Sequence, residues 1–454
     1  MTKDQPRYER IAIIGGGPGG LAAAKGLALE PIEFQTIDLY ERRDKLGGLW
    51  YHNGDKNLIH PPIPNSDPDC HEIVDNGATD EDIYFSAIYK YMETNIIHRL
   101  MQYSELPYPP KTATFPKRQV VYKYLQDYVE TIPDKVNVNL NSEVLELKKK
   151  NDEWELKTKD NTKYYDAVII ANGHFNAPFI PEVKGLETWN SKKPDTILHS
   201  KNFQDPNSFR DKTVLVIGNA ASGVDISTQI STVAKKTIVS VRDLSNKGFE
   251  NELVKYIGII EEYDYKNSSV KTKDEVVEDI DYVIFCTGYL YTIPFLKPNT
   301  DIITNGRQIH NIYKQIFNIY DPSLSFMIIM QQILPLILAE SQSALIARVY
   351  SGRYDLPSTE EMLKSYQKEL KERGEGSNFH TFGYPKDCEY GEMLQALIDN
   401  KNLRHPGLVA PIWDNQLVED RSQSKDIKNK RLEELVEHVK KLRSEGKDFV
   451  LLDH

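Results

Sequence analysis

The sequence predicts an α/β protein with two Rossmann-like dinucleotide-binding domains, the smaller one inserted in the larger. Three observations predict this fold. Two glycine-rich turns each follow a short apolar run of strand type and precede a helical pattern. Strand and helix patterns alternate in the first part of the chain, as a parallel sheet with crossover helices requires. The length of 454 residues is sufficient for two or three domains, each with its own core.

The first turn follows the apolar run at 11–14 and precedes a helical stretch at 21–27. In this setting Gly15 makes the tight turn, Gly17 lets the backbone approach a pyrophosphate, and Gly20 lets the helix pack close to its strand. The N-terminus of the helix then offers free N–H groups to the phosphates. The residues of the turn are Gly15, Gly16, Gly17, Pro18, Gly19 and Gly20.

An acidic residue supports this interpretation of the first turn. The next predicted strand, at 34–40, is followed by Glu41. This lies about 20 residues beyond the turn, where an acid is expected to bind a ribose hydroxyl. We therefore predict a diphosphate-binding site at the first turn.

The second turn is less regular. It follows the apolar run at 214–217 and comprises Gly218, Asn219, Ala220, Ala221, Ser222 and Gly223. Ala220 replaces the central glycine, and its methyl group narrows the approach of a ligand without forbidding it. The strand predicted at 237–241 is followed by Arg242, whose guanidinium suits a 2′-phosphate and favours NADPH over NADH. Asp243 comes next and leaves the opposite preference open. Two such turns in one chain indicate a flavin served by a nicotinamide.

Charge and hydropathy exclude several classes of protein. The formal net charge is -11, and basic residues occur only in short clusters, which argues against a nucleic-acid partner. The polar first residues do not resemble a signal peptide. The longest apolar stretch, at 324–339, is shorter than the about 20 residues of a membrane span and contains polar residues and a proline. We expect no transmembrane segment and interpret this stretch as buried core or cofactor wall.

The cysteines exclude one class of flavoprotein. Cys70, Cys286 and Cys388 are too scattered for a CxxC pair or a metal site. We therefore expect no bound metal and no redox cysteine pair of the disulfide-reductase type. Cys286 is predicted to be a buried, inert thiol, and a cytoplasmic, reducing compartment fits this composition.

The predicted domains are 1–186 for the first part of the flavin domain, 187–309 for the nicotinamide domain, and 310–454 for the return to the flavin domain. An irregular loop is expected at 53–82. The other predicted elements are a helix at 120–132, a three-stranded meander at 136–140, 144–148 and 154–158, strands at 167–171 and 282–289, and helices at 340–350 and 431–443.

The chain resembles the flavin-containing monooxygenase family over nearly its whole length, and most closely the short, soluble fungal type. The resemblance rests on both turns and on the segments 41–43, 46–50, 92–95, 172–174 and 285–289, together with His199. The family signature FxGxxxHxxx(Y/F) is matched by His199 and Phe203, but Asp195 replaces its glycine and Lys193 its aromatic residue. This departure puts the linker geometry in question, and a hydrogen-bonded strut is the simpler role for His199.

The resemblance implies FAD and NADPH as cofactors, with O2 as co-substrate. NADPH would reduce FAD, oxygen would add at flavin C4a, and the hydroperoxide would transfer its terminal oxygen. It further implies that Asn95 is the catalytic residue, donating a hydrogen bond to the peroxide, although a turn or helix-cap asparagine is the plainer alternative. The remaining implied cofactor-binding residues are Gly48, Leu49, Trp50 and Thr94. Gln331, Gln332 and Gln342 would lie near the flavin ring without an assigned role, and Tyr289 and Tyr291 would line the nicotinamide side or cap a strand.

The predicted function is oxygenation of a soft nucleophile: a thiol, a thioether or an amine. Two alternatives stay open, a Baeyer–Villiger monooxygenase acting on ketones and an NADPH oxidase producing hydrogen peroxide. The sequence leaves open the physiological substrate, a homodimeric state, and a peripheral association with the surface of the endoplasmic reticulum.

Overall fold

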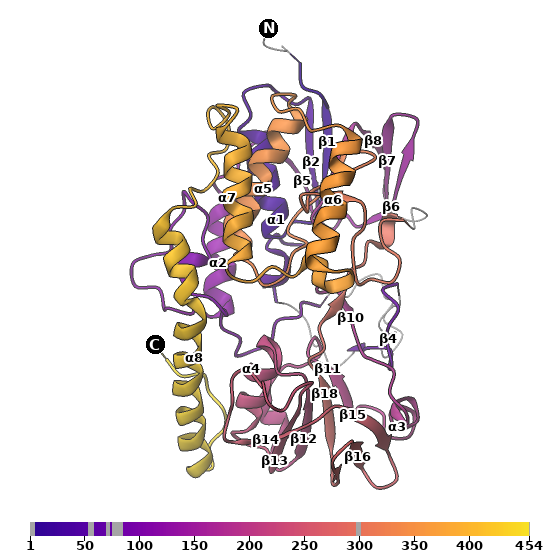
Figure 1. The fold of residues 1–454 in the computed structure, drawn as a ribbon, viewed down its shortest axis with the longest axis vertical. Helices are drawn as coiled ribbons and strands as arrows, with labels where there is room; N and C mark the ends of the chain where they lie inside the picture. The colour runs from indigo at the N-terminus through magenta and orange to yellow at the C-terminus, as the bar shows by residue number, and fades with distance from the viewer. Residues whose placement is uncertain (1–4, 53–58, 70–72, 75–84, 297–300, 454) are drawn as a thin grey trace. The chain divides into compact units, whose positions relative to one another are not determined.

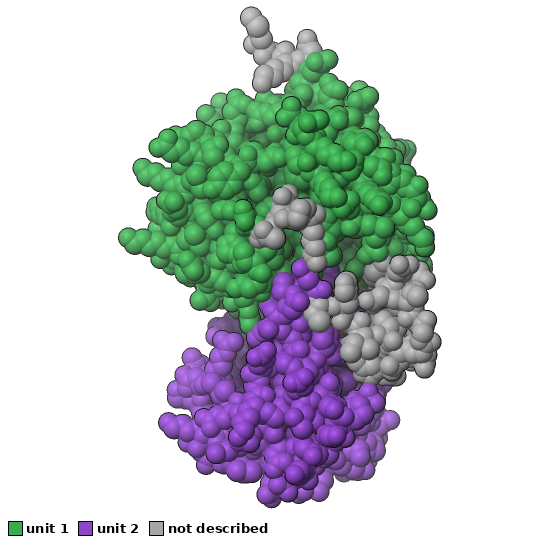
Figure 2. All heavy atoms as spheres, turned by 90° about the vertical axis from the view of Figure 1, so that its right-hand side faces the viewer, with its two compact units in different colours: residues 1–51, 96–174, 291–424 green, residues 52–95, 175–290, 425–454 purple. Residues whose placement is uncertain are grey.

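The structure is a computed structural model that describes residues 5–52, 59–69, 73–74, 85–296 and 301–453. Cys70 and most of the loop predicted at 53–82 lie outside these residues. The chain forms two compact units, coloured green and purple in Figure 2. Unit 1 contains residues 1–51, 96–174 and 291–424, and unit 2 contains residues 52–95, 175–290 and 425–454.

Unit 1 is organised around a sheet of seven described strands in the order β20-β21-β22-β9-β1-β2-β5. Strands β22, β9, β1, β2 and β5 run parallel, whereas β20 and β21 pair antiparallel (Figure 1). The strands are β1 (Arg10–Ile14), β2 (Thr36–Tyr40), β5 (Asn137–Asn139), β9 (Ala167–Ile170), β20 (Ile312–Tyr313), β21 (Phe317–Asn318) and β22 (Leu324–Phe326). The sheet is accompanied by α1 (Pro18–Ala28), α2 (Arg118–Val129), α5 (Pro335–Tyr350), α6 (Thr359–Arg373) and α7 (Lys386–Asp399).

The predicted three-stranded meander is wrong in one strand. The meander consists of β6 (Val144–Lys150), β7 (Glu153–Thr158) and β8 (Thr162–Tyr165). The run predicted at 136–140 is instead β5, which pairs with β2 at the edge of the main sheet. Because β5 is short and largely exposed, and β8 exposes three of its four residues, neither strand has the alternation that distinguishes a buried strand.

Unit 2 contains a parallel sheet in the order β11-β18-β12-β13-β14, with α4 (Ala221–Ile230) following β12. Its strands are β11 (Ile197–His199), β12 (Thr213–Ile217), β13 (Lys236–Ser240), β14 (Val254–Ile257) and β18 (Tyr282–Phe285). Smaller elements complete the unit: β3 (Ile59–His60) with β4 (Ile73–Val74), β10 (Ala177–Pro178) with β19 (Tyr289–Leu290), a sheet of β15 (Ile260–Asp264), β16 (Ser269–Thr272) and β17 (Val276–Val277), and α3 (Leu186–Lys192).

The C-terminal residues belong to unit 2 because α8 (Asn415–Ser444) buries apolar side chains there. Leu432 and Leu435 pack against Val224 of α4. Further along, Val439 and Leu442 cluster with Phe449. The contact units therefore divide the chain differently from the predicted domains, which returned the whole of 310–454 to the first domain. No helix among the described residues has the length and apolar character needed to cross a bilayer.

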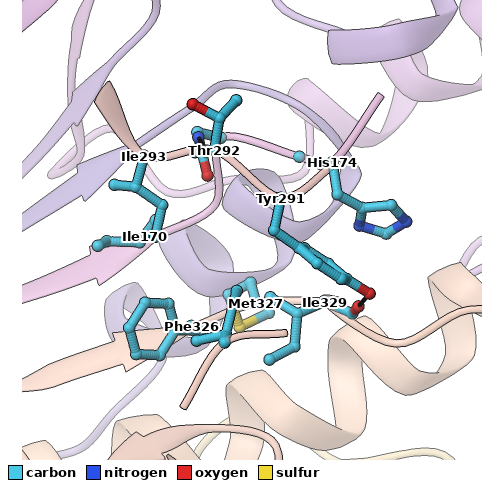
Figure 3. Close-up of a pocket in the computed structure, with 11 residues that line it drawn as sticks. Ile170, His174, Tyr291, Thr292, Ile293, Phe326, Met327 and Ile329 are labelled. Carbon is cyan, nitrogen blue, oxygen red and sulfur yellow. Dashed lines mark hydrogen bonds between the residues drawn. The ribbon is translucent and has the colours of Figure 1, made fainter. Parts of the chain in front are cut away.

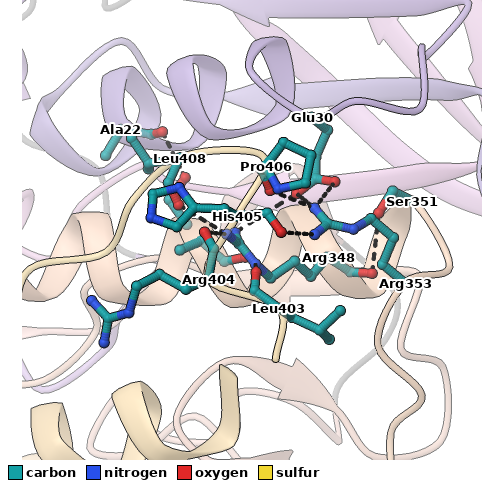
Figure 4. A network of polar contacts seen from close by, with 12 residues as sticks. Ala22, Glu30, Arg348, Ser351, Arg353, Leu403, Arg404, His405, Pro406 and Leu408 are labelled. Carbon is teal, nitrogen blue, oxygen red and sulfur yellow. Dashed lines mark hydrogen bonds and ion pairs between the residues drawn. The ribbon is translucent and has the colours of Figure 1, made fainter. Parts of the chain in front are cut away.

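A buried ion pair joins three segments of unit 1 (Figure 4). Glu30, just beyond α1, lies 3.7 Å from the Arg348 guanidinium and 2.9 Å from that of Arg353. Arg348 also donates to the carbonyl oxygens of Leu403 at 2.6 Å and Arg404 at 2.8 Å. Burial lowers the pKa of Arg348 to about 10, which leaves it charged at neutral pH. The network ties the end of α1 and helix α5 to the loop 403–408.

Candidate functional site

The first glycine turn has a backbone that requires glycine at its first and last positions. Gly15 follows β1 with φ +113°, and a Cβ there would lie 2.3 Å from the carbonyl oxygen of Ala171. A Cβ on Gly20 would lie 1.8 Å from the carbonyl oxygen of Gly15. Both distances are too short for any side chain. The structure therefore places these two glycines in the turning and packing roles expected from the sequence.

Gly17 meets a second backbone segment. A Cβ built on Gly17 would lie 3.3 Å from the Cα of Gly48, and one on Gly48, whose φ is +54°, only 2.5 Å from the Cα of Gly17. Gly48 begins the 3-10 turn Gly48–Trp50, in which Trp50 is buried. Arg43 donates to the carbonyl oxygens of Gly48 and Tyr51 and so holds this turn in place. The fold thus brings Gly48, Leu49 and Trp50 to the first turn.

Glu41 lies beside the turn, directly after β2. Its Oε2 accepts a hydrogen bond from Gly16 N at 2.8 Å, and its Oε1 accepts one from Arg43 N at 3.0 Å. A carboxylate has about four acceptor sites, so these bonds leave capacity for a ribose hydroxyl. Gly17, the N-cap of α1, has no side chain to bond the first N–H groups of the helix. Those donors suit a diphosphate, and the residues present fit a dinucleotide.

A narrow pocket lies at the same sheet edge, where β9 and β22 end (Figure 3). It begins at Ile170, one residue before the Ala171 that contacts Gly15. The carboxyl edge of a parallel sheet is where open α/β folds bind ligands. The pocket has a volume of about 10 Å³, room for one water-sized molecule. It is lined by Ile170, Asn172, Gly173, His174, Tyr291, Thr292, Ile293, Ile309, Phe326, Met327 and Ile329.

Polar contacts hold the pocket wall. Tyr291 donates its hydroxyl to the carbonyl oxygen of Ile329 at 2.7 Å and accepts from Gln331 Nε2 at 3.2 Å. Asn172 Nδ2 donates to the carbonyl oxygen of Thr292 at 2.9 Å. Burial lowers the pKa of His174 to about 4, so its imidazole is neutral at physiological pH. The wall is therefore fixed and uncharged.

The three glutamines of the return segment have different roles. Gln342 accepts from Ile328 N and donates to Tyr390 Oη, both at 2.9 Å, and is a buried strut. Gln332 contributes a backbone carbonyl oxygen that accepts from Arg421 at 3.2 Å. Gln331 is the one of the three that contacts a pocket residue, Tyr291. Residue type alone could not separate them.

The second turn repeats the first in unit 2. Gly218 has φ +104°, and a Cβ there would lie 2.7 Å from the carbonyl oxygen of Cys286. A Cβ on Gly223 would lie 2.0 Å from the carbonyl oxygen of Gly218. Ala220 is the N-cap of α4 with φ -85°, a conformation any residue adopts, and it is exposed. Its methyl group therefore causes no backbone strain, and Ser222 follows in the first turn of α4.

Arg242 and Asp243 differ in their surroundings. Arg242 is exposed on the loop that follows β13. Asp243 accepts from both the backbone N and the hydroxyl of Ser245, at 2.8 and 2.6 Å, and these bonds lower its pKa. Asn219, within the second turn, donates to the carbonyl oxygen of Lys247 at 2.7 Å and so ties this loop to the turn. The loop thus uses Asp243 in its own turn and presents Arg242 to solvent.

The segment 93–95 lies in unit 2. Glu93 and Thr94 are buried, whereas Asn95 is exposed. Lys428 of α8 donates to the carbonyl oxygen of Thr94 at 3.0 Å. Thr94 and Asn95 thus belong with the second turn, while Glu41, Gly48, Leu49 and Trp50 belong with the first turn in unit 1.

His199 is a hydrogen-bonded strut. It is fully buried, its Nε2 donates to the carbonyl oxygen of Gly288 at 3.0 Å, and its Nδ1 accepts from Lys201 N at 3.2 Å. Burial lowers its pKa to about 3, so the ring is neutral. Asp195, at the glycine position of the signature, has φ +64°. Aspartate tolerates this left-handed conformation better than most residues, so the linker adopts here an angle that glycine would also allow.

The two cysteines within the described residues are buried free thiols. Burial raises the pKa of Cys388 to about 12 and raises that of Cys286 well above the ordinary thiol range. Cys286 is therefore an inert thiol, as predicted, and its carbonyl oxygen is the atom that approaches Gly218.

Known proteins are similar to this chain in sequence and in fold. A family model described as flavin-binding monooxygenase-like matches residues 77–247 and 253–400, and one described as an NAD(P)-binding Rossmann-like domain matches residues 13–65. The thiol-specific monooxygenase of Saccharomyces cerevisiae is 31% identical over 98% of each chain. The Arabidopsis thaliana flavin-containing monooxygenase FMO GS-OX4 is 29% identical over 87% of this chain and 86% of its own.

A solved structure agrees with these relatives. The S-allyl-L-cysteine S-oxygenase of Allium sativum superposes with a TM-score of 0.75 at 26% identity, covering 96% of this chain and 98% of its own. The likeness therefore extends over both nucleotide-binding units rather than over one shared domain.

Proposed function

The chain belongs to the flavin-binding monooxygenase-like family, and from this premise we propose that it oxygenates small sulfur compounds, and other soft nucleophiles, with NADPH and O2. The family confirms the predicted cofactors, FAD and NADPH. Two of the relatives carry names that specify a thiol or an S-substituted cysteine as substrate. A thiol or thioether is therefore the first substrate class to test, and amines the second.

The pair of matching turns is the observation that carries the proposal. The first turn would hold the FAD diphosphate, with Glu41 binding its ribose, and the second would hold NADPH, with Arg242 binding its 2′-phosphate. NADPH supplies two electrons; one atom of O2 joins the sulfur or nitrogen, and the other leaves as water. When bound, the flavin carries these electrons to oxygen. The role of the protein is to position both dinucleotides.

Asn95 has a distinct role in this proposal. An amide N–H donates a hydrogen bond without giving up its proton. Asn95 can therefore hold the activated oxygen without promoting its loss as hydrogen peroxide. The exposure of Asn95, directly after two buried residues, supports a side chain that is presented rather than packed.

A substrate panel tests the reaction class. We expect thiols, thioethers and uncharged amines to give oxygenated product equal to the NADPH consumed, at similar maximal rates, and cyclic ketones to react poorly. NADPH, product and peroxide are measured together. Lactone formation from ketones without sulfur or nitrogen oxygenation would establish the Baeyer–Villiger alternative. Peroxide equal to NADPH with every compound would establish an oxidase.

Substitution of Asn95 tests its role. Asn95→Ala should leave flavin reduction by NADPH within about twofold of the parent, because hydride transfer does not use the amide. The share of NADPH that ends as peroxide should rise from a minor to the major fraction. Asn267→Ala is the matched control, since Asn267 bonds Asp264 on a hairpin of the same unit. Unchanged product per NADPH in Asn95→Ala would remove Asn95 from the mechanism.

A further inference from the structure

A buried carboxylate lies two residues before Asn95. The Glu93 side chain is 1% exposed, and it meets two cations of helix α8. Arg431 donates from Nη2 to Oε2 at 3.0 Å and from Nε to both oxygens at 3.3 Å. Lys428 donates to Oε1 at 3.0 Å. The buried carboxylate of Glu93 is therefore held by two charge-assisted hydrogen-bond partners.

The same two cations also donate hydrogen bonds to backbone carbonyl oxygens of two other segments. Lys428 also donates to the carbonyl oxygen of Thr94, at 3.0 Å. Arg431 donates to the carbonyl oxygen of Leu452 at 2.7 Å. Lys428 and Arg431 are three residues apart and thus share one face of α8. Burial alone would raise the pKa of Glu93, but the two cations outweigh it and lower the pKa, so the carboxylate stays charged.

The residues that precede Glu93 are also anchored in unit 2. Tyr89 donates its hydroxyl to Asp225 of α4, and its ring packs edge-on against Phe203 at 5.2 Å between centroids. Tyr91 packs edge-on against Phe449 at 5.1 Å. The chain is therefore held at alternate residues up to Glu93, and Asn95 is the first exposed side chain after this anchored run.

We propose that Glu93 is a positioning residue. Together with Lys428 and Arg431 of α8 it fixes the backbone that presents the side-chain amide of Asn95. The inference rests on the proposed function, because Asn95 is given its role there. A buried ion pair adds little net stability compared with apolar packing, but in some proteins it specifies one conformation, and that is the role we assign to it here. Here Lys428 also holds the carbonyl of Thr94, which belongs to the peptide bond between Thr94 and Asn95.

Arg431→Met tests the proposal with two measurements. In FAD-loaded protein without substrate, amide hydrogen exchange in peptides covering residues 92–97 should become at least tenfold faster. During turnover, the fraction of NADPH that ends as peroxide should rise at least threefold, while flavin reduction stays within twofold of the parent. Arg431→Lys, which keeps the charge but loses the paired donors, should show both changes to a smaller degree. If Arg431→Met does not fold, Arg431→Lys and Glu93→Gln carry the same two measurements.

Arg443→Met is the matched control. Arg443 lies on the same helix and donates to the carbonyl oxygen of Ala234 at 2.7 Å, and its hydrogen-bond partners are Ser231, Ala234 and Lys235 rather than residues of segment 89–95. It should leave exchange at 92–97 and peroxide unchanged. Equal peroxide in Arg443→Met and Arg431→Met, or unchanged exchange in Arg431→Met, would overturn the proposal. If Asn95→Ala raises the fraction of NADPH that ends as peroxide and Arg431→Met does not, the positioning role of Glu93 is wrong while the role of Asn95 stands. If Arg431→Met accelerates exchange but Asn95→Ala leaves the fraction of NADPH that ends as peroxide unchanged, the role of Asn95 is wrong instead.

Discussion

The two glycine turns differ far more in amino-acid sequence than in backbone conformation. Gly15 and Gly218 have φ of +113° and +104°. The N-caps that follow, Gly17 and Ala220, have φ and ψ of -82° and -175° in one and -85° and -168° in the other. Because these angles are nearly identical, the central position does not require glycine for its conformation. What differs is the surroundings.

Those surroundings explain where glycine is needed. Gly17 faces the backbone of Gly48, so two chain segments meet where the first diphosphate is expected. Ala220 is exposed. A buried acid, Glu41, accepts a hydrogen bond from the first turn, whereas the exposed Arg242 follows the strand that pairs with β12. The comparison teaches that the fold requires glycine at the first and last positions of each turn. The residue allowed at the central position depends on which group lies next to it.

The largest expected effect tests the outer glycines. Gly20→Ala and Gly223→Ala should each force the helix away from its turn, because the new Cβ would meet a carbonyl oxygen at 1.8 or 2.0 Å. Overpacking of this kind costs about 1–3 kcal/mol or more. Thermal unfolding and bound FAD should show Gly20→Ala losing flavin, whereas Gly223→Ala should keep flavin and lose reduction by NADPH. Full flavin content in Gly20→Ala would refute the role of the first turn.

The next effect separates the central positions. Gly17→Val should lose FAD, because its side chain would occupy the space beside Gly48. Ala220→Gly should leave NADPH binding within about threefold, since the methyl group is exposed and unstrained. Absorbance of bound flavin and titration with NADP⁺ measure the two outcomes. Normal flavin in Gly17→Val would mean that the two central positions are equivalent after all.

The last effect concerns the choice of coenzyme alone. Arg242→Ala should weaken the binding of NADPH by about 1.5–3 kcal/mol, the value of a hydrogen bond to a charged group. This corresponds to a roughly tenfold to hundredfold rise in the KM for NADPH. The binding of NADH should be nearly unchanged. Asp243→Ala is the control, because Asp243 bonds Ser245 in its own turn. Equal losses for both coenzymes would make Arg242 a structural residue.

Much of this arrangement could be predicted from the sequence because it is local. A strand, a glycine turn and a helix are contiguous, and so were found at 11–27 and at 214–230. The contacts of Glu93 could not be found in the same way, since Lys428 and Arg431 are more than three hundred residues away in the chain. Nor could residue type show that Gln342 is a strut and Gln331 a pocket contact. Edge strand β5 was misplaced because a short exposed strand has no hydrophobic period to identify it.

Asp195 has a consequence for how relatives of this chain are recognised. The signature requires glycine at this position, whereas this chain has Asp195 in a left-handed backbone conformation with φ +64°. Asparagine and aspartate are the residues most able to replace glycine at such an angle. A search pattern that accepted either at this place, and required the strut histidine four residues later, would describe a dihedral angle instead of an amino acid. Such a pattern would describe this chain, which the family model matches across the same segment.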